Sequence, residues 1–325
     1  MRILSAAEIE RLVPMSEAIA AVRDAFAQLA TDKAQSPVRS VLRVPRHDNF
    51  ILVMPGYVSK PEIFTVKTVS VVPSNPHRGL PRVVATVLAV NPADGLPIGL
   101  LEGTSVTALR TGAASGVATD LLARKKVSRA VVIGAGPQGR SQVLGIDAVR
   151  DFDDIRILSK ERRSADRLVR SLRGKTRARL QIADSAKDVR DADVVCAATN
   201  SLEPVFAGRD IQPGCHVNGV GSFRPEMQEV DVEFLTRCDK IVVDQREGAW
   251  AEAGELIIAK NEGAITEDDV FAEIGEVAAG LKPGRQGKDE ITFFKSVGNA
   301  VQDAAVAALA IKAAKRENVG RDIKL

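Results

Sequence analysis

The spacing of apolar residues changes character part-way along the chain. Near the N-terminus, apolar residues recur at intervals of three and four, at Ile19, Val22, Phe26 and Leu29. This period predicts a helix with one buried face. Three runs of β-type residues follow, separated by turn residues, at 50–54, 64–72 and 83–90. Strands that follow one another without an intervening helix predict an antiparallel sheet.

After the basic segment at 123–129, short apolar runs alternate with segments typical of helices. The runs lie at 129–134, 155–159, 178–183, 193–199, 216–220 and 240–244. Such alternation predicts βαβ units and a parallel sheet covered on both faces. Two Ala-rich segments, 105–123 and 299–316, predict closely packed helices, and we expect the second to return to the first domain.

These patterns predict an α/β protein of two domains. We expect a smaller α+β domain with an antiparallel sheet, formed by 1–120 with 300–325. We expect a Rossmann-type doubly wound parallel sheet in 121–299. A length of 325 residues suits two domains of ordinary size.

Composition narrows the classes of partner. Lys and Arg number 45 against 42 Asp and Glu, and no long basic run occurs, which argues against nucleic acid. No stretch of about 18 apolar residues predicts a membrane span, and the charged N-terminus does not resemble a signal peptide. Three cysteines without a CxxC pair suit a reducing cytoplasm. Three histidines without HExxH argue against a metal site.

The run AVVIGAGPQGRSQVLGI contains a dinucleotide-binding fingerprint. It has the GxGxxG spacing directly after a predicted strand, and the residues that we expect to contact a cofactor are Gly134, Gly136, Pro137, Gln138 and Gly139. The glycines permit a tight turn, close approach to a pyrophosphate and helix packing on the strand. The amides at the helix start would face the phosphates. The alternative is a structural turn in an α/β protein that binds no nucleotide.

The end of the second Rossmann strand selects between NAD and NADP. An acidic residue there holds the ribose of NAD. Here the strand ends at Ser159, followed by Lys160, Glu161, Arg162 and Arg163. A hydroxyl and several cations suit a 2′-phosphate, so the sequence favours NADPH, with contacts from Ser159, Lys160 and Arg163. The alternative is a solvated helix start, in which Glu161 could still reach the ribose of NADH.

Three cations stand in apolar or uncharged surroundings of the first domain. They are Arg39, Lys67 and Arg110. Arginine offers a bidentate fork for a carboxylate, and lysine is a compact charge that can give up a proton. Lys67 interrupts an apolar strand, so it is either a charge that protects an edge strand or a buried, functional amine.

Together these motifs resemble the ornithine cyclodeaminase/mu-crystallin family over nearly the whole chain. The segments that carry the resemblance are PVRS, TVKTVS, VTALRTGAASGVATDLLA, IGAGPQG, VNGVGSFRPEMQEV and FFKSVGNAVQD. The resemblance implies a homodimer in which the smaller domain, 1–120 with 300–325, serves substrate binding and dimerisation, and the Rossmann domain, 121–299, binds a nicotinamide cofactor, NAD(P). It implies that Arg39, Lys67 and Arg110 line the substrate pocket. It also implies cofactor contacts from Thr199, Val220, Gly221, Ser222 and Ser296.

One departure from the family bears on the reaction. Cyclodeaminases carry an acidic residue in the motif that resembles VGGDCPGK, and Phe223 stands at its position here. A phenyl ring cannot exchange a proton, which argues against cyclodeaminase activity and favours the ketimine reductase branch.

We therefore expect NAD(P)H-dependent reduction of Δ1-pyrroline-2-carboxylate, and of Δ1-piperideine-2-carboxylate as a second substrate, with Lys67 and Arg110 as catalytic residues. Lys67 would assist protonation of the imine nitrogen, and the arginines would hold the carboxylate. The alternatives are an alanine or opine-type dehydrogenase, an ornithine cyclodeaminase, and a non-enzymatic protein that binds a small molecule together with NADPH.

Overall fold

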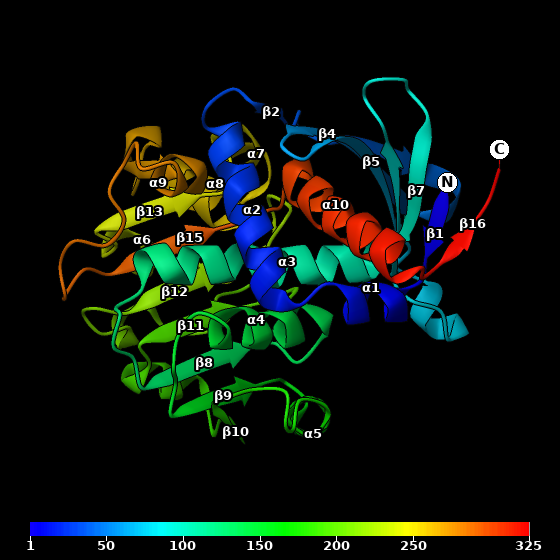
Figure 1. Cartoon of the computed structure of the whole chain (residues 1–325). Helices are drawn as coiled ribbons and strands as arrows, with labels where there is room; N and C mark the ends of the chain where they lie inside the picture. The colour runs from blue at the N-terminus through cyan, green and yellow to red at the C-terminus, as the bar shows by residue number, and fades with distance from the viewer. Residues whose placement is uncertain (325) are drawn as a thin grey trace. The chain divides into compact units, whose positions relative to one another are not determined.

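The computed structural model describes residues 1–324, and its contacts divide the chain into two compact units (Figure 1). The first unit holds Met1–Arg110 together with the segment from Asn299 to the C-terminus, and the second holds Thr111–Gly298. The boundary falls inside helix α3, Gly103–Leu122. The sequence placed it after residue 120, because a continuous helix offers no change of pattern to mark it.

A largely antiparallel sheet forms the first unit. Its strand order is β16-β1-β7-β6-β5-β4-β2, with β3 also beside β4, and β1 pairs with β7 in parallel. The strands are β1 Arg2–Leu4, β2 Ala34–Gln35, β3 Ser40–Val44, β4 Asn49–Ser59, β5 Glu62–Val71, β6 Val83–Val90, β7 Pro97–Glu102 and β16 Arg321–Asp322. The predicted antiparallel arrangement of the three longest runs is confirmed. The sequence missed the short strands at the edges.

The long C-terminal helix covers one face of this sheet. The helices of the unit, besides the start of α3, are α1 Ala6–Leu12, α2 Met15–Leu29 and α10 Ala300–Glu317. Helix α10 lies across β4, β5 and β6, and α2 packs against α10 (Figure 1). The approach is close: a Cβ added to Gly56 on β4 would lie 2.7 Å from the Cβ of Ala300. Small side chains thus bring the first turn of α10 close to the strands.

A parallel sheet of eight strands forms the second unit. Its order is β10-β9-β8-β11-β12-β15-β13-β14. The strands are β8 Arg129–Ile133, β9 Asp154–Leu158, β10 Arg179–Ile182, β11 Val194–Ala197, β12 His216–Gly219, β13 Lys240–Val243, β14 Val270–Glu273 and β15 Thr292–Lys295. The predicted doubly wound sheet is confirmed. The sequence missed β14 and β15, because four-residue strands ending in a charge give too short an apolar run.

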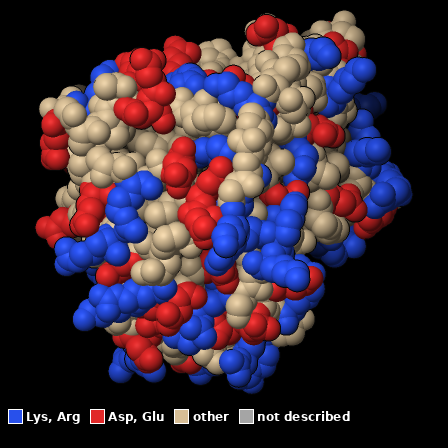
Figure 2. Space-filling model, turned by 90° about the vertical axis from the view of Figure 1, so that its left-hand side faces the viewer, with Lys and Arg blue, Asp and Glu red and all other residues tan. Residues whose placement is uncertain are grey.

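Six helices accompany this sheet: α4 Pro137–Asp147, α5 Arg162–Ser171, α6 Val232–Thr236, α7 Arg246–Glu252, α8 Gly254–Asn261 and α9 Ile274–Ala278. Single 3-10 turns occur at Pro45–His47, Asn75–Arg78, Ala186–Asp191, Gly208–Asp210 and Glu267–Asp269. Within residues 1–324, no helix is both long and apolar enough to span a bilayer. On the face drawn in Figure 2, cationic and acidic side chains are interspersed.

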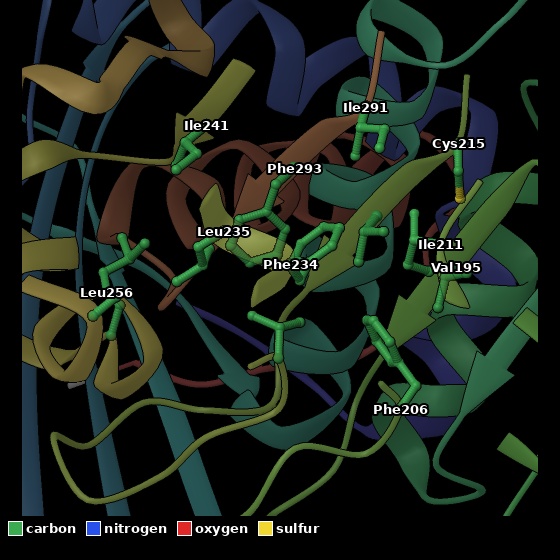
Figure 3. Close-up of a cluster of buried hydrophobic side chains, with 14 of the residues drawn as sticks. Val195, Phe206, Ile211, Cys215, Phe234, Leu235, Ile241, Leu256, Ile291 and Phe293 are labelled. Atoms are coloured by element: carbon green, nitrogen blue, oxygen red, sulfur yellow. The ribbon is translucent and has the colours of Figure 1, made fainter. Parts of the chain in front are cut away.

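A cluster of hydrophobic side chains, with three phenylalanine rings among them, fills the core of the second unit on one side of the sheet (Figure 3). The ring of Phe234 meets Phe293 edge to face at 5.3 Å between centroids, and meets Phe206 in the same way at 5.9 Å. All three rings are buried. Edge-to-face aromatic packing is directional as well as apolar, so the cluster fixes β15 against α6 and supports the loops that follow the strands.

Candidate functional site

Lys67 lies inside the sheet of the first unit rather than at its edge. Its strand β5 pairs with β4 on one side and β6 on the other. The Lys67 side chain is only 1% exposed. The interpretation of Lys67 as a protective charge on an edge strand is therefore wrong. Burying an ammonium group carries a large desolvation cost, so its surroundings must compensate.

One carboxylate from α10 meets two of the predicted cations. Lys67 Nζ lies 2.7 Å from Asp303 Oδ2, and Arg110 Nε lies 3.4 Å from Asp303 Oδ1. Arg110 Nη1 also donates a hydrogen bond of 2.8 Å to Gln302 Oε1. All four side chains are buried. The structure thus brings Lys67 and Arg110 together at one carboxylate of α10, and their contacts with substrate stay a prediction.

The surroundings of Lys67 favour its neutral form. The pKa of Lys67 is lowered to about 7: burial is the largest cause, charge repulsion from Arg110 and Arg39 acts in the same direction, and Asp303 opposes the shift. Arg39 is half-buried, and its Nη1 lies 4.0 Å from Met54 Sδ. An amine with this pKa exchanges its proton near neutral pH, which is what acid–base catalysis requires.

Among residues 1–324, Gln302 Nε2 and Thr65 Oγ1, beside this cluster, find no hydrogen-bond partner. Both side chains are buried. Thr65 precedes Lys67 by two positions on β5, so both side chains lie on the sheet face that α10 covers. Unpaired buried donors cost free energy, and a polar ligand bound here would satisfy them.

Asp303 and Gln302 were not predicted from the sequence. Asp303 belongs to a helix whose buried residues include Ala300, Ala304 and Ala307. It therefore occupies a position of the apolar stripe, where an unpaired acid would be costly. A charged residue at a position that the helical period assigns to the buried face was therefore a signal by which Asp303 could have been found.

The glycine loop of the second unit has the geometry of a phosphate cradle. Gly134 has φ of +114°, and a Cβ there would strike the carbonyl oxygen of Ala198. A Cβ on Gly139 would strike the carbonyl oxygen of Gly134, so α4 packs directly on the turn. Gly136, in contrast, faces open space. Pro137 and Gln138 are the first two residues of α4. The amides in the first turn of a helix have no hydrogen-bond partner within the helix. These residues fit a dinucleotide pyrophosphate.

The end of β9 presents a hydroxyl and cations. Ser159 follows the strand, and Lys160 and Arg163 are exposed beside it. Glu161 is the N-cap of α5, and its carboxylate accepts a 3.1 Å hydrogen bond from Ser164 Oγ. The one nearby carboxylate is thus occupied along its own helix, which weakens the alternative in which it holds a ribose.

Thr199 is the second residue after β11, and Val220 and Gly221 are the first two residues after β12. The backbone N–H and hydroxyl of Thr199 donate to Glu229 Oε1, at 2.6 and 2.8 Å. The N–H of Gly221 donates to the other oxygen of Glu229 at 2.6 Å. Glu229 is fully buried, and burial raises its pKa. Sequence reasoning missed Glu229, which lies in a loop where no period marks it.

The side chains of Ser222 and Ser296 are turned into the second unit. Ser222 Oγ bonds to Glu255 and to Lys295, and the Oγ of Ser296 donates to Asp244 at 2.8 Å. Both serines are buried. Their hydroxyls hold the loops in place, and their cofactor contacts stay a prediction.

The chain is similar along its whole length to proteins of one known family. The model of the ornithine cyclodeaminase/mu-crystallin family matches residues 1–318. The chain is 34% identical over 325 residues to a Δ1-pyrroline-2-carboxylate reductase of Bacillus cereus, covering 100% of both chains.

Two solved structures have the same fold. The Δ1-pyrroline-2-carboxylate reductase of Thermococcus litoralis, in complex with NADH and L-proline, is 40% identical with a TM-score of 0.95 and coverage of 99% and 100%. An archaeal alanine dehydrogenase dimer with bound NAD is 36% identical with a TM-score of 0.92 and coverage of 100% and 99%. The chain belongs to the ornithine cyclodeaminase/mu-crystallin family.

Proposed function

We propose that this protein is an NAD(P)H-dependent reductase of cyclic imino acids, which converts Δ1-pyrroline-2-carboxylate to L-proline and Δ1-piperideine-2-carboxylate to L-pipecolate. The observation that carries the proposal is the buried cluster of Lys67, Arg110 and Asp303. Its support is full-length similarity to reductases of the first substrate.

The reduction adds a hydride to the imine carbon and a proton to the imine nitrogen. A bound nicotinamide supplies the hydride. Arg39 and Arg110 bind the α-carboxylate and orient the ring, which supplies much of the rate. Lys67, with a pKa of about 7, holds the proton and delivers it toward the nitrogen, and Asp303 keeps the ammonium form available.

NADPH is the proposed cofactor, with NADH as the second choice. The support is Ser159 with Lys160 and Arg163 at the end of β9, and the engagement of Glu161 by Ser164. The 2′-phosphate of NADPH carries negative charge that these cations would attract, whereas the unphosphorylated ribose of NADH would gain little from them. The two structures compared above contain NADH and NAD.

A homodimer is the proposed assembly. On the sheet face opposite Lys67, four residues on neighbouring strands lie side by side. From β6 to β3 they are Val84, Ser70, Ile51 and Leu42. Leu42 is 57% and Val84 46% exposed. Exposed apolar side chains grouped on one face mark association surfaces, and an archaeal relative is a dimer.

A reducing compartment such as the cytoplasm is the proposed location. Cys196, Cys215 and Cys238 are all free thiols. Burial raises the pKa of both Cys196 and Cys215 to about 12, which keeps them inert.

A second candidate is an alanine dehydrogenase, because the chain is 36% identical to one. A substrate panel separates the two. The purified protein is mixed with NADPH or NADH and with Δ1-pyrroline-2-carboxylate, Δ1-piperideine-2-carboxylate, or pyruvate plus ammonia, and loss of reduced nicotinamide is followed.

We expect the cyclic imines to be turned over fastest. Faster turnover of pyruvate plus ammonia would replace the proposal by the second candidate. A parallel assay of L-ornithine with catalytic NAD should yield no proline, because Phe223 offers no acid. Comparable proline formation from ornithine would overturn this interpretation of Phe223.

A further inference from the structure

Glu229 joins two loops that come from neighbouring strands of the parallel sheet. Oε1 accepts hydrogen bonds from the N–H and hydroxyl of Thr199 after β11. Oε2 accepts from the N–H of Gly221 at 2.6 Å and of Ser222 at 3.3 Å after β12. Both carboxylate oxygens are therefore used, one for each loop, and the side chain is fully buried.

The two loops also touch without any side chain between them. A Cβ added to Gly221 would strike the backbone N and O of Thr199 and Oε1 of Glu229. A glutamate carries acceptors alone, so it can meet donors from both sides at once. A glutamine in its place would turn an NH₂ group toward one of these N–H donors. The site at position 229 therefore requires a carboxylate, and not only a side chain of the size of glutamate.

A second buried side chain, that of Lys295, also binds the β12 loop. Lys295 Nζ donates to the carbonyl oxygen of Ser222 at 2.8 Å and to its Oγ at 2.7 Å, and pairs with Glu255 Oε1 at 3.0 Å. All three side chains are fully buried. The main chain of the β12 loop is thus fixed on both sides, by Glu229 and by Lys295.

The place of these loops in the sheet assigns them to one half of the cofactor. In a doubly wound sheet the ligand lies across the carboxyl ends of the strands, at the point where the strand order reverses. Here that point lies between β8 and β11. The adenosine half falls to β8 and β9, which carry the glycine loop and Ser159, and the nicotinamide half falls to β11 and β12.

We propose that Glu229 is a positioning residue for the nicotinamide half of the cofactor, acting through the backbone of Thr199 and Gly221. It deepens the proposed function and rests on that function only for the identity of the cofactor as a nicotinamide dinucleotide. Glu229 itself touches neither cofactor nor substrate in this assignment. It sets the distance between the two loops, and the loops bind the nicotinamide ribose.

The test compares Glu229→Gln with wild type in two binding titrations and one exchange measurement. NADPH binding is followed by nicotinamide fluorescence, and adenosine 2′,5′-bisphosphate, which lacks the nicotinamide half, by calorimetry. We expect NADPH to bind about tenfold more weakly, which is about 1.4 kcal/mol, and the fragment within twofold of wild type. Hydrogen exchange of the Thr199 and Gly221 amides should accelerate in the protein free of cofactor.

Asp147→Asn is the matched control. Asp147 is another buried carboxylate of the second unit, and it accepts from the backbone N–H of Arg177 at 2.9 Å and of Ala178 at 3.0 Å, before β10. It should lower thermal stability without changing the ratio of NADPH to fragment affinity. Glu229→Asp keeps both oxygens and should fall between wild type and Glu229→Gln. It also serves as the test variant should Glu229→Gln fail to fold.

Two outcomes would overturn the proposal: unchanged NADPH affinity, or an equal loss of NADPH and fragment affinity, which would indicate general loosening of the unit. Neither titration depends on turnover. A wild-type protein that binds NADPH but reduces no imine would therefore contradict the proposed function and leave this inference standing.

Discussion

Lys67 in the first unit and Lys295 in the second are both buried beside an acidic partner, and they differ in how fully they are bonded. Lys295 uses its ammonium group on Glu255 and on two oxygens of Ser222. Lys67 has, among residues 1–324, Asp303 as its one bonded partner. An ammonium group carries three donors, so Lys295 is satisfied by the protein and Lys67 is not.

The difference separates a structural lysine from one suited to chemistry. Asp303 is shared between Lys67 and Arg110, and the neighbouring Gln302 amide and Thr65 hydroxyl are unpaired. Around Lys295, the charges and backbone groups meet one another. Burial alone therefore does not identify a functional amine. Incomplete bonding together with its own pKa near neutrality makes Lys67 the candidate for proton transfer.

The largest expected effect is on catalysis by Lys67 variants. Lys67→Met removes charge and proton, and Lys67→Arg keeps the charge but scarcely donates a proton. Both should lower kcat by about 10²–10⁴-fold, with cofactor affinity intact. Steady-state kinetics and NADPH titration measure this, with Lys60→Met, at an exposed position in the turn after β4, as control. If Arg restores kcat and Met mainly raises KM, then Lys67 only anchors the carboxylate.

We expect the free energy of unfolding to depend more strongly on Lys295 than on Lys67, the reverse of the expected effect on catalysis. Lys295→Met leaves Glu255 buried without its counter-charge, and we expect the free energy of unfolding to fall by about 3–5 kcal/mol. Lys67→Met leaves Asp303 still paired with Arg110 and relieves the burial of an ammonium group, so its cost should be much smaller. Urea denaturation of both variants measures the difference. Equal losses would show that the two lysines are alike in their bonding.

The pH dependence of imine reduction tests the role of Asp303. If protonated Lys67 is the acid, kcat/KM falls as pH rises through about 7. Asp303 raises the pKa of Lys67, so Asp303→Asn should lower that pKa and move the falling limb to lower pH. Each pH unit of displacement costs about tenfold in kcat/KM above the limb. An unmoved limb in Asp303→Asn would mean that another group titrates.

The smallest effect concerns the choice of cofactor. Ser159→Asp places a carboxylate where the 2′-phosphate of NADPH is expected and offers a partner to the ribose hydroxyls of NADH. The ratio of NADPH to NADH affinity should fall by about tenfold, or about 1.4 kcal/mol. Titration with both cofactors measures it. A wild-type protein that already favours NADH would refute the interpretation of the β9 end.

The sequence by itself determined the local features of the molecule. The glycine spacing of residues 134–139 predicted a turn that packs a helix on a strand, and a Cβ on Gly139 would indeed strike Gly134. The alternation of short apolar runs with helices predicted the parallel sheet, and Lys67, Arg110 and Arg39 were found as charges in apolar contexts. These signals are local, because period and turn chemistry report the face of an element and where it ends.

Only the tertiary structure decided what these residues meet. Asp303 reaches Lys67 because α10 folds back across β5 from the far end of the chain. Lys67 became interior because β6 pairs with β5, and no pattern within β5 distinguishes a central from an edge strand. Glu229 reaches the backbone of both Thr199 and Gly221 because β11 and β12 lie side by side in the sheet. The hydrophobic period of a segment shows which face is buried. It does not show which residues of other segments pack against that face, because only the tertiary structure brings distant segments together.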